Sequence, residues 1–360
     1  MNVNLTKLIS SAAAVLAVGS TSYAQQKAAM PATCCFEQGY EICNDKFPAA
    51  YNAAARIDVQ CSWDFFVTGS FIYWHVDQDA MDYAYLVNGD SIPVQSTVLV
   101  QDFDYKPGFK VGLGVDFDHD NWVGYVEYTW LHQKTNSGYE SAPATFNYVT
   151  PWLNIDTLGE AEVVSSIGTS WRTNLDIVDA VLSRPFYQGR KLTVLPFGGL
   201  RGAWIRQDFT VNAIGDAGTV FASKNRSHSW AVGARAGLQA HWMLGWGFRF
   251  EGDAAGSLLY TQYTKIRHNE FADGVSDLSI RYHEYNTVRP MADMSVGMGW
   301  GSYLDRQNYH FDLLATYDFN VMWGQNMMRE LNNIVNGSGA VSDAGDLHLH
   351  GLTVTARFDF

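Results

Sequence analysis

The chain has 360 residues, and no Pro/Ser-rich linker or block of charge divides it, so one large unit is expected. Aromatic residues make up 14% of the sequence and charged residues only 17%, below the ~25% typical of soluble domains. The formal net charge of -13 argues against nucleic acid as a partner, because phosphates require a basic surface.

The first 24 residues have the pattern of a secretory signal peptide. Lys7 precedes an apolar run at residues 8–18, and the small residues Ser22 and Ala24 come just before the expected cleavage point. The run is too short to cross a bilayer as a helix. Gln25 follows Ala24 instead of a cysteine, so no lipid anchor is expected. The mature chain is therefore predicted to be exported.

All four cysteines, Cys34, Cys35, Cys43 and Cys61, lie between the signal peptide and the first predicted strand. An exported chain meets an oxidising compartment, so disulfides are the expected state. Cys34 and Cys35 are adjacent and would bridge each other only with strain, so each is expected to pair with Cys43, Cys61 or a neighbouring molecule. A metal site is the alternative, but the spacing matches no zinc pattern of two plus two ligands.

From residue 64 onward, apolar side chains recur at every second position, which is the period of a β-strand. Ten segments follow the pattern, at residues 64–76, 109–118, 122–132, 171–184, 192–206, 230–241, 246–258, 289–300, 309–321 and 351–360. In the clearest of them, the charged side chains keep to one side. In residues 171–184 neither side is cleanly apolar, so the facing of that strand stays open.

The last predicted strand, residues 351–360, has two chemically different sides. Its apolar side carries Leu352, Val354, Ala356, Phe358 and Phe360, whereas the other side carries Thr353, Thr355, Arg357 and Asp359. In an outer-membrane barrel the apolar side meets lipid and the charged side meets the lumen. A strand that ends on Phe358 and Phe360 is the expected signal to the barrel-assembly machinery.

The fold class predicted from these segments is all-β, a transmembrane antiparallel up-and-down β-barrel of about ten strands over residues 64–360. A signal peptide at residues 1–24 and a short cysteine-containing periplasmic or luminal segment at 25–63 would precede it. Strands of ~10 residues suit a tilted crossing of the bilayer. Because residues 93–105 also alternate, 12 or more strands stay an open alternative.

The predicted connections alternate in length, and this rhythm indicates orientation. Short connections are expected at residues 118–121, 185–190, 243–245 and 301–308, and long ones at 77–107, 133–169, 207–227, 261–287 and 323–346. Barrels of the bacterial outer membrane have short periplasmic turns and long extracellular loops. Both ends of the barrel would therefore lie in the periplasm, with five loops outside.

Several segments also resemble one known family. They read DFFVTGSFIYW at residues 64–74, PGFKVGLG at 107–114, VEYTW at 126–130, LSRPF at 182–186, LPFGGLRGAWI at 195–205 and LHGLTVTARFDF at 349–360. Together and in this order they resemble the Legionella-type major outer membrane proteins, a MOMP-like family also found in chlamydia-related bacteria. The resemblance implies a pore-forming protein and supplies no catalytic residues. The cysteine-rich start is similar, more loosely, to disulfide-linked outer membranes of chlamydia-like organisms.

Charged residues on the non-lipid side are the candidates for lining a pore. They are Lys110, Asp116, Glu127, Arg201, Arg235, Arg249, Glu251, Asp253, Asp293, Asp312, Asp318 and Arg357, with Arg289 and Asp359 beside them. They could pair into a network that fills a narrow barrel, or they could line a path for water. We expect a small pore for solutes or ions with a weak preference for cations, constricted by side chains or by the amino-terminal segment.

Two other functions are considered. A structural or adhesive barrel would work through its loops, with disulfides to neighbouring copies or a homo-oligomer, and lipid as its surroundings. Enzyme activity is not expected, because the histidines at 241, 310, 348 and 350 lack a recognisable catalytic context. The glycine pairs at 112 and 114 and at 297 and 299 lack the strand-to-helix setting of a phosphate cradle. No cofactor and no metal are predicted.

Overall fold

The computed structural model describes residues 57, 59, 64–88, 95–117, 121–139, 142, 146–154, 163–188, 191–328 and 345–360. The predicted signal peptide and all four cysteines lie outside these residues. The disulfide predictions therefore stay predictions. Among the described residues, no helix is long and apolar enough to span a bilayer.

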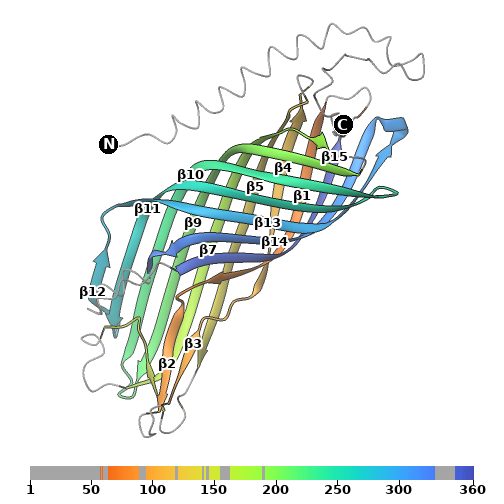
Figure 1. The fold of residues 1–360 in the computed structure, drawn as a ribbon. Helices are drawn as coiled ribbons and strands as arrows, with labels where there is room; N and C mark the ends of the chain where they lie inside the picture. Colours follow the sequence, from red (N-terminus) through yellow and green to blue (C-terminus); the bar gives the residue numbers. More distant parts are fainter. Residues whose placement is uncertain are drawn as a thin grey trace, which may run out of the picture. The chain divides into compact units, whose positions relative to one another are not determined.

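Ten long antiparallel strands form a closed wall (Figure 1). They are β1 (Phe65–Gln78), β4 (Tyr105–Asp116), β5 (Val123–Tyr139), β7 (Val164–Ser183), β9 (Leu192–Gly215), β10 (Val220–Gly245), β11 (Phe248–Ala272), β13 (Tyr285–Leu304), β14 (Tyr309–Asn326) and β15 (Gly345–Asp359). Each pairs with its neighbour in chain order, and β1 pairs with both β4 and β15, which closes the barrel. The predicted fold class and strand number are confirmed.

Five short strands lie in the connections between wall strands. They are β2 (Asp82–Asn88), β3 (Gln95–Val100), β6 (Phe146–Val149), β8 (Phe186–Tyr187) and β12 (Val275–Arg281). The alternation near residues 93–105 therefore belongs to the β2–β3 hairpin and does not add a wall strand.

One predicted loop is wrong. Residues 207–227 do not form a long loop, because β9 and β10 run on through most of them and join at residues 216–219. Apolar residues alternate there as well, but they point inward, whereas in the rest of these strands the apolar residues point outward. The pattern therefore does not predict that the strands continue through this segment.

The two ends of the barrel differ. We name the turn end after the tight connections, such as residues 246–247 between β10 and β11, and the loop end after the opposite connections. At the turn end the first and last strands meet, since Phe65 and Phe360 exchange two backbone hydrogen bonds of 3.3 and 3.0 Å.

The strands are strongly staggered around the wall. Direct pairing partners run from Trp230 on β10 through Trp204, Asp176, Trp130, Phe109, Phe71, Val354, Ala315, Met298 and Phe250, and return to β10 at Trp242. The register has then shifted by 12 residues. With ten strands this gives a tilt of about 40° and about 10 Å from the barrel axis to the backbone. Side chains from opposite walls can therefore meet.

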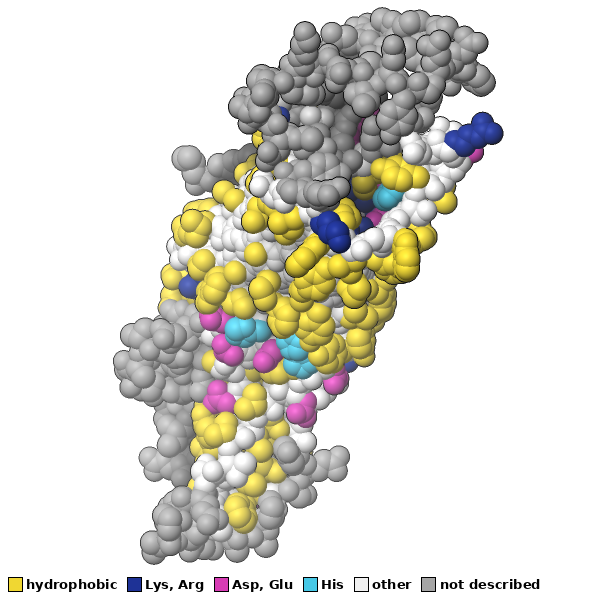
Figure 2. All heavy atoms as spheres, turned by 45° about the vertical axis from the view of Figure 1, so that its right-hand side comes forward, with side chains coloured by type: hydrophobic (Ala, Val, Ile, Leu, Met, Phe, Trp, Pro, Cys, Tyr) yellow, Lys and Arg dark blue, Asp and Glu magenta, His cyan; other side chains and the backbone are white. Residues whose placement is uncertain are grey.

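An apolar band surrounds the turn-end half of the barrel (Figure 2). On β10 its outward side chains run from Trp230 to Trp242, and on β9 the band ends at Trp204. Twelve residues at this tilt span about 30 Å, close to the hydrocarbon thickness of a bilayer. The apolar side of the predicted strands therefore faces outward, as expected.

The polarity of the two faces inverts beyond this band. On β9 the inward side chain is Arg201 within the band but Ala203 and then Ile205 above it, while the outward residues change from Trp204 to Arg206. The loop-end half therefore has a polar exterior, and its interior combines buried apolar side chains with hydrogen-bonded polar ones such as His268 and Glu270.

The interior of the loop end is a packed core. Wall residues such as Trp74, Trp171 and Phe209 contribute to it, together with Trp152 from the segment after β6. The Trp152 ring packs against Phe209 with 4.8 Å between ring centroids, and its Nε1 donates a 2.7 Å hydrogen bond to the Asp82 carbonyl. We call the cluster the loop-end core; it fills the barrel above the band.

Candidate functional site

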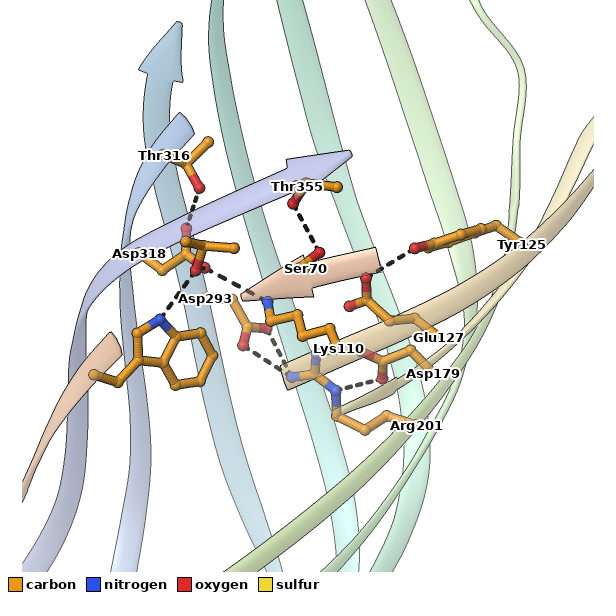
Figure 3. A network of polar contacts seen from close by, with 12 residues as sticks. Ser70, Lys110, Tyr125, Glu127, Asp179, Arg201, Asp293, Thr316, Asp318 and Thr355 are labelled. Atoms are coloured by element: carbon orange, nitrogen blue, oxygen red, sulfur yellow. Dashed lines mark hydrogen bonds and ion pairs between the residues drawn. The ribbon is translucent and has the colours of Figure 1, made fainter. Parts of the chain in front are cut away.

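The site with the most polar chemistry lies inside the barrel, at the level of the band. Its centre is Arg201 on β9, which is only 4% exposed. Its Nε and Nη2 donate hydrogen bonds of 2.6 and 2.7 Å to the Asp179 carboxylate on the neighbouring strand β7. Its Nη1 lies 2.9 and 2.8 Å from the two oxygens of Asp293 on β13 (Figure 3). One guanidinium therefore joins two distant parts of the wall.

A second cation shares the central acids. Arg235 on β10 also donates to Asp293 and lies over the Phe197 ring. Arg201 Nη1 is 3.0 Å from the Met291 sulfur, which belongs to the loop-end core. The polar network thus ends directly against the apolar interior.

Lys110 on β4 approaches the network from the other side of the lumen. Its Nζ lies 3.5 Å from Asp318 on β14 and 4.8 Å from the Trp74 ring centroid. Asp318 also accepts 2.7 Å hydrogen bonds from Thr316 and Thr353 (Figure 3). Trp74 Nε1 donates to Thr353 at 3.0 Å. Asp318 therefore accepts from several donors, and a movement of its side chain would leave those donors without this partner.

A separate layer lies nearer the turn end. Arg249 donates to Asp312 across β11, β13 and β14, and its Nε is 3.0 Å from Glu251. Gln239 donates a 2.6 Å hydrogen bond to Glu251, and His241 Nε2 lies 3.3 Å from the same carboxylate. Arg249 is thus shared between two carboxylates, those of Asp312 and Glu251.

The closing strands carry a third group. Arg357 on β15 donates a 2.9 Å hydrogen bond to Asp359, and its guanidinium carbon lies 3.6 Å from the Phe66 ring centroid. His310 Nδ1 is 3.1 Å from Asp359. Phe66 fits inside the wall because β4 has Gly114 opposite it, where a Cβ would overlap the Phe66 ring.

All twelve predicted pore-lining residues lie on inward positions of their strands. The structure brings Arg201, Arg235 and Asp293 into direct contact, and Arg249, Glu251 and Asp312 likewise. Asp116 lies at the turn end, where its backbone N–H bonds to the Asp64 carbonyl. Phe358 in the last strand stacks on Tyr309 with 5.6 Å between ring centroids.

Sequence reasoning missed Asp179, the second partner of Arg201. The polarity of β7 inverts near Asp176, so neither side of the strand is apolar throughout and its inward residues were not assigned. A shorter window ending at Ser183 would have placed Val178, Ala180 and Leu182 on one side and Asp179 on the other. Which inward side chains touch one another is not encoded in the alternation at all.

Water-accessible surface persists inside the band despite this pairing. Lys110, Glu127, Arg235, Asp253 and Arg357 face inward and are only partly buried. By contrast, the inward side chains above the Arg201 level, such as Leu175 and Phe209, have no exposed surface. The lumen therefore has a polar space within the band and an apolar closure above it.

Comparisons with known proteins agree with the barrel. The model of the family described as Legionella pneumophila major outer membrane protein precursor matches residues 58–360. No curated protein matches the sequence.

Three solved structures show a low similarity to the chain. The outer membrane protease OmpT from Escherichia coli is 8% identical with a TM-score of 0.39, over 86% of this chain and 99% of that one. Ail, the attachment invasion locus protein of Yersinia pestis, is 7% identical with a TM-score of 0.25, over 82% and 97%. A Pseudomonas aeruginosa FadL homologue is 6% identical with a TM-score of 0.22, over 82% and 89%. Nothing about activity follows from likenesses this low.

Proposed function

The chain belongs to the Legionella pneumophila major outer membrane protein family, and from this premise we propose that it is a small gated pore for ions in the outer membrane. The barrel fold and the family agree on the bacterial outer membrane as its location. In the proposal the polar lumen within the band is the conducting path, and the loop-end core is the closed gate.

One observation carries the proposal. The inward charges at the level of the band keep surface that water can reach, whereas the inward side chains beyond them are packed and buried, both the apolar ones of the loop-end core and polar ones such as His268 and Glu270. A lumen that was only a structural filling would have no need of partly hydrated charges such as Lys110 and Asp253, because uncompensated or partly solvated charge is costly inside a membrane. The obstruction is thus concentrated at one end.

The acidic surplus sets the expected selectivity. Acidic side chains outnumber basic ones among the described inward residues of the band, and Asp253 forms no ion pair with any of them. Charged rings of one sign select ions of the opposite sign in narrow pores. A weak preference for cations follows.

The orientation is also part of the proposal. Short turns face the periplasm and longer connections face outward in outer-membrane barrels. We therefore assign the loop end to the cell exterior. A cysteine at Ala217, at the tip of the β9–β10 hairpin, should react with a membrane-impermeant maleimide on intact cells when the native cysteines are Ser. A cysteine at Trp246, in a turn-end connection, should not react.

Single-channel recording in a planar bilayer tests the pore. The wild type should show small, infrequent, cation-preferring steps. Trp152→Ala should open the barrel more often, because it removes a fully buried ring and its hydrogen bond from the loop-end core. Trp246→Ala is the control, since Trp246 is 97% exposed in a turn-end connection. Silence from both the wild type and Trp152→Ala would refute the pore.

A structural barrel is the second candidate, and the central ion pairs favour it. Arg201 on β9 and Asp293 on β13 join two parts of the wall inside the barrel, and a barrel that only anchors loops would be stabilised by this contact. Cross-linking through Cys34, Cys35, Cys43 or Cys61 would belong to this function. Non-reducing gels of outer membranes should then show a ladder that disappears when the four cysteines are Ser, and a monomer in the unreduced wild type would count against it.

A further inference from the structure

The exterior of the loop end, just beyond the apolar band, has two chemically opposite faces. Acidic and histidine side chains follow the band on the face drawn in Figure 2. On β1 and β15 such residues are His75, Asp77, Asp79, Asp346, His348 and His350. On β5, β7, β9, β10 and β11 the outward residues at the corresponding height include Lys134, Arg172, Arg206, Lys224, Arg226 and Arg267. We call these six the basic face.

The strand register places cations of the basic face directly beside one another. Lys134 pairs with Arg172 across β5 and β7, and Arg226 pairs with Arg267 across β10 and β11. Like charges in directly opposite positions of an antiparallel pair destabilise the sheet. An anion bound between them would remove this repulsion.

The chain itself supplies little negative charge to this face. Asp208, between Arg172 and Arg226 in the register, has its Oδ1 3.1 Å from Arg226 Nε and its Oδ2 3.6 Å from His228 Nε2. Contact with His228 and the nearby charges of Arg226 and Arg172 lower the pKa of Asp208 below its usual value. Within the described part of the chain, no ion pair is formed by Lys134, Arg172 or Lys224.

The face is also hollowed. A pocket of about 320 Å³ lies among Lys134, Arg172, Asp208, Thr210, Lys224 and Arg226, and Ser170 adds a further hydroxyl to its lining. Four cations and two hydroxyls around one opening match the donors that a phosphate group accepts. The pocket is therefore a second indication of an anionic ligand, independent of the charge count.

The height of the pocket identifies the kind of anion. Lys134, Arg206 and Arg226 lie two to four residues beyond Trp130, Trp204 and Trp230, the aromatic residues at the edge of the band. At a tilt of about 40° this is roughly 5–10 Å above the hydrocarbon edge, where lipid headgroups lie. Directly below, Leu200 and Val232 expose apolar side chains on which acyl chains would rest.

We propose that the basic face binds the phosphorylated headgroup of a glycolipid of the outer leaflet, lipopolysaccharide, with its phosphate groups at Lys134, Arg172 and Arg226 and its acyl chains along the apolar wall of β9 and β10. The assignment to the outer leaflet rests on the proposed orientation of the barrel. The opposite face, with its acids, repels the same headgroup, so the lipid binds on one side.

Binding to bicelles tests the proposal without depending on the pore or on orientation. The purified full-length protein should bind bicelles that contain diphosphoryl lipid A more tightly than bicelles of dephosphorylated lipid A, and added salt should weaken the difference. The triple variant Lys134→Gln, Arg172→Gln, Arg226→Gln should lose on the order of 100-fold in apparent affinity, since each basic residue near a charged lipid surface contributes about fivefold.

A matched control removes the same charge from the other end. The variant Arg184→Gln, Lys191→Gln, Arg306→Gln changes three cations at turn-end positions and should bind lipid A like the wild type. Equal losses in both triple variants would reduce the effect to net charge and overturn the site. Full competition by millimolar inorganic phosphate would show a free-anion site and would overturn the lipid. If the lipid binds but neither the wild type nor Trp152→Ala conducts ions, the pore proposal fails and the lipid site stands.

Discussion

Arg201 on β9 and Asp293 on β13 meet inside the barrel with 2.8 Å between Nη1 and Oδ2, although 92 residues separate them in the chain. Their contact is possible because ten strands at this tilt leave about 10 Å between axis and wall. The pair lies where the polar lumen gives way to the loop-end core.

Replacing one partner of this pair should destabilise the barrel strongly. Asp293→Ala leaves Arg201 with Asp179 alone and deprives Arg235 of its acid, so about 3–5 kcal/mol of unfolding free energy should be lost. Urea unfolding in lipid vesicles, followed by the gel mobility of unboiled samples, measures it. The double variant Arg201→Met, Asp293→Leu should lose less than the single one, because no buried charge is then left without a partner.

Filling the space beside Phe66 should be costly. A Cβ at Gly114 would overlap the Phe66 ring, which in turn supports the Arg357 guanidinium. Gly114→Ala should therefore reduce the unfolding free energy by about 1–3 kcal/mol. Gly69→Ala, on the neighbouring strand with no atom within 4 Å of a new Cβ, should have little effect and serves as the control. Equal stability of the two variants would contradict the packing described.

The depth of the band can be tested on one strand. Leu200 and Asn212 both point outward from β9, but Leu200 lies within the band, 62% exposed, and Asn212 lies beyond it. Leu200→Arg should cost about 2–4 kcal/mol near the bilayer midplane, whereas Asn212→Arg should cost about 0–1 kcal/mol. Unfolding from vesicles gives both values. A similar cost at both positions would mean that lipid covers the whole strand.

The stability of the loop end should depend on pH through Asp208. Its pKa is lowered in the folded state by His228 and Arg226, so ionised Asp208 stabilises the fold above its unfolded pKa, near 3.8. That contribution is lost as the pH falls through the lower, folded pKa. Asp208→Asn should therefore be slightly less stable than wild type at pH 7, by up to about 1 kcal/mol, and equal to it near pH 2. A difference that grew on acidification would contradict this assignment.

Much of the barrel could be predicted from period-two alternation, because lipid and lumen impose opposite chemistry on adjacent residues. Strands such as β10 and β15 were placed to within a few residues in the band. The rule that the apolar side of a strand faces outward fails beyond the band, where the strands no longer contact lipid. Beyond Trp204 the exterior is water, so the apolar side turns inward, and the alternation predicts a loop at residues 207–227 although most of them are strand.

The contacts inside the lumen could be predicted only in part. Alternation tells which side of a strand a charge occupies, and the twelve candidates lie on inward positions of the strands. It does not tell which partner a charge meets, because that depends on the stagger of strands far apart in the chain. Arg201 with Asp293 and Lys110 with Asp318 therefore emerged only from the three-dimensional register.

The pairing of β1 with β15 has a consequence for biogenesis. Thirteen residue pairs join these strands, and the final backbone bonds are those between Phe65 and Phe360. A nascent chain lacking even its carboxyl-terminal hairpin would present two unpaired strand edges, the usual starting points of aggregation. The pairing of β1 with β15 can form only after the whole polypeptide has crossed the inner membrane. Until then the unfolded polypeptide depends on chaperones to prevent aggregation.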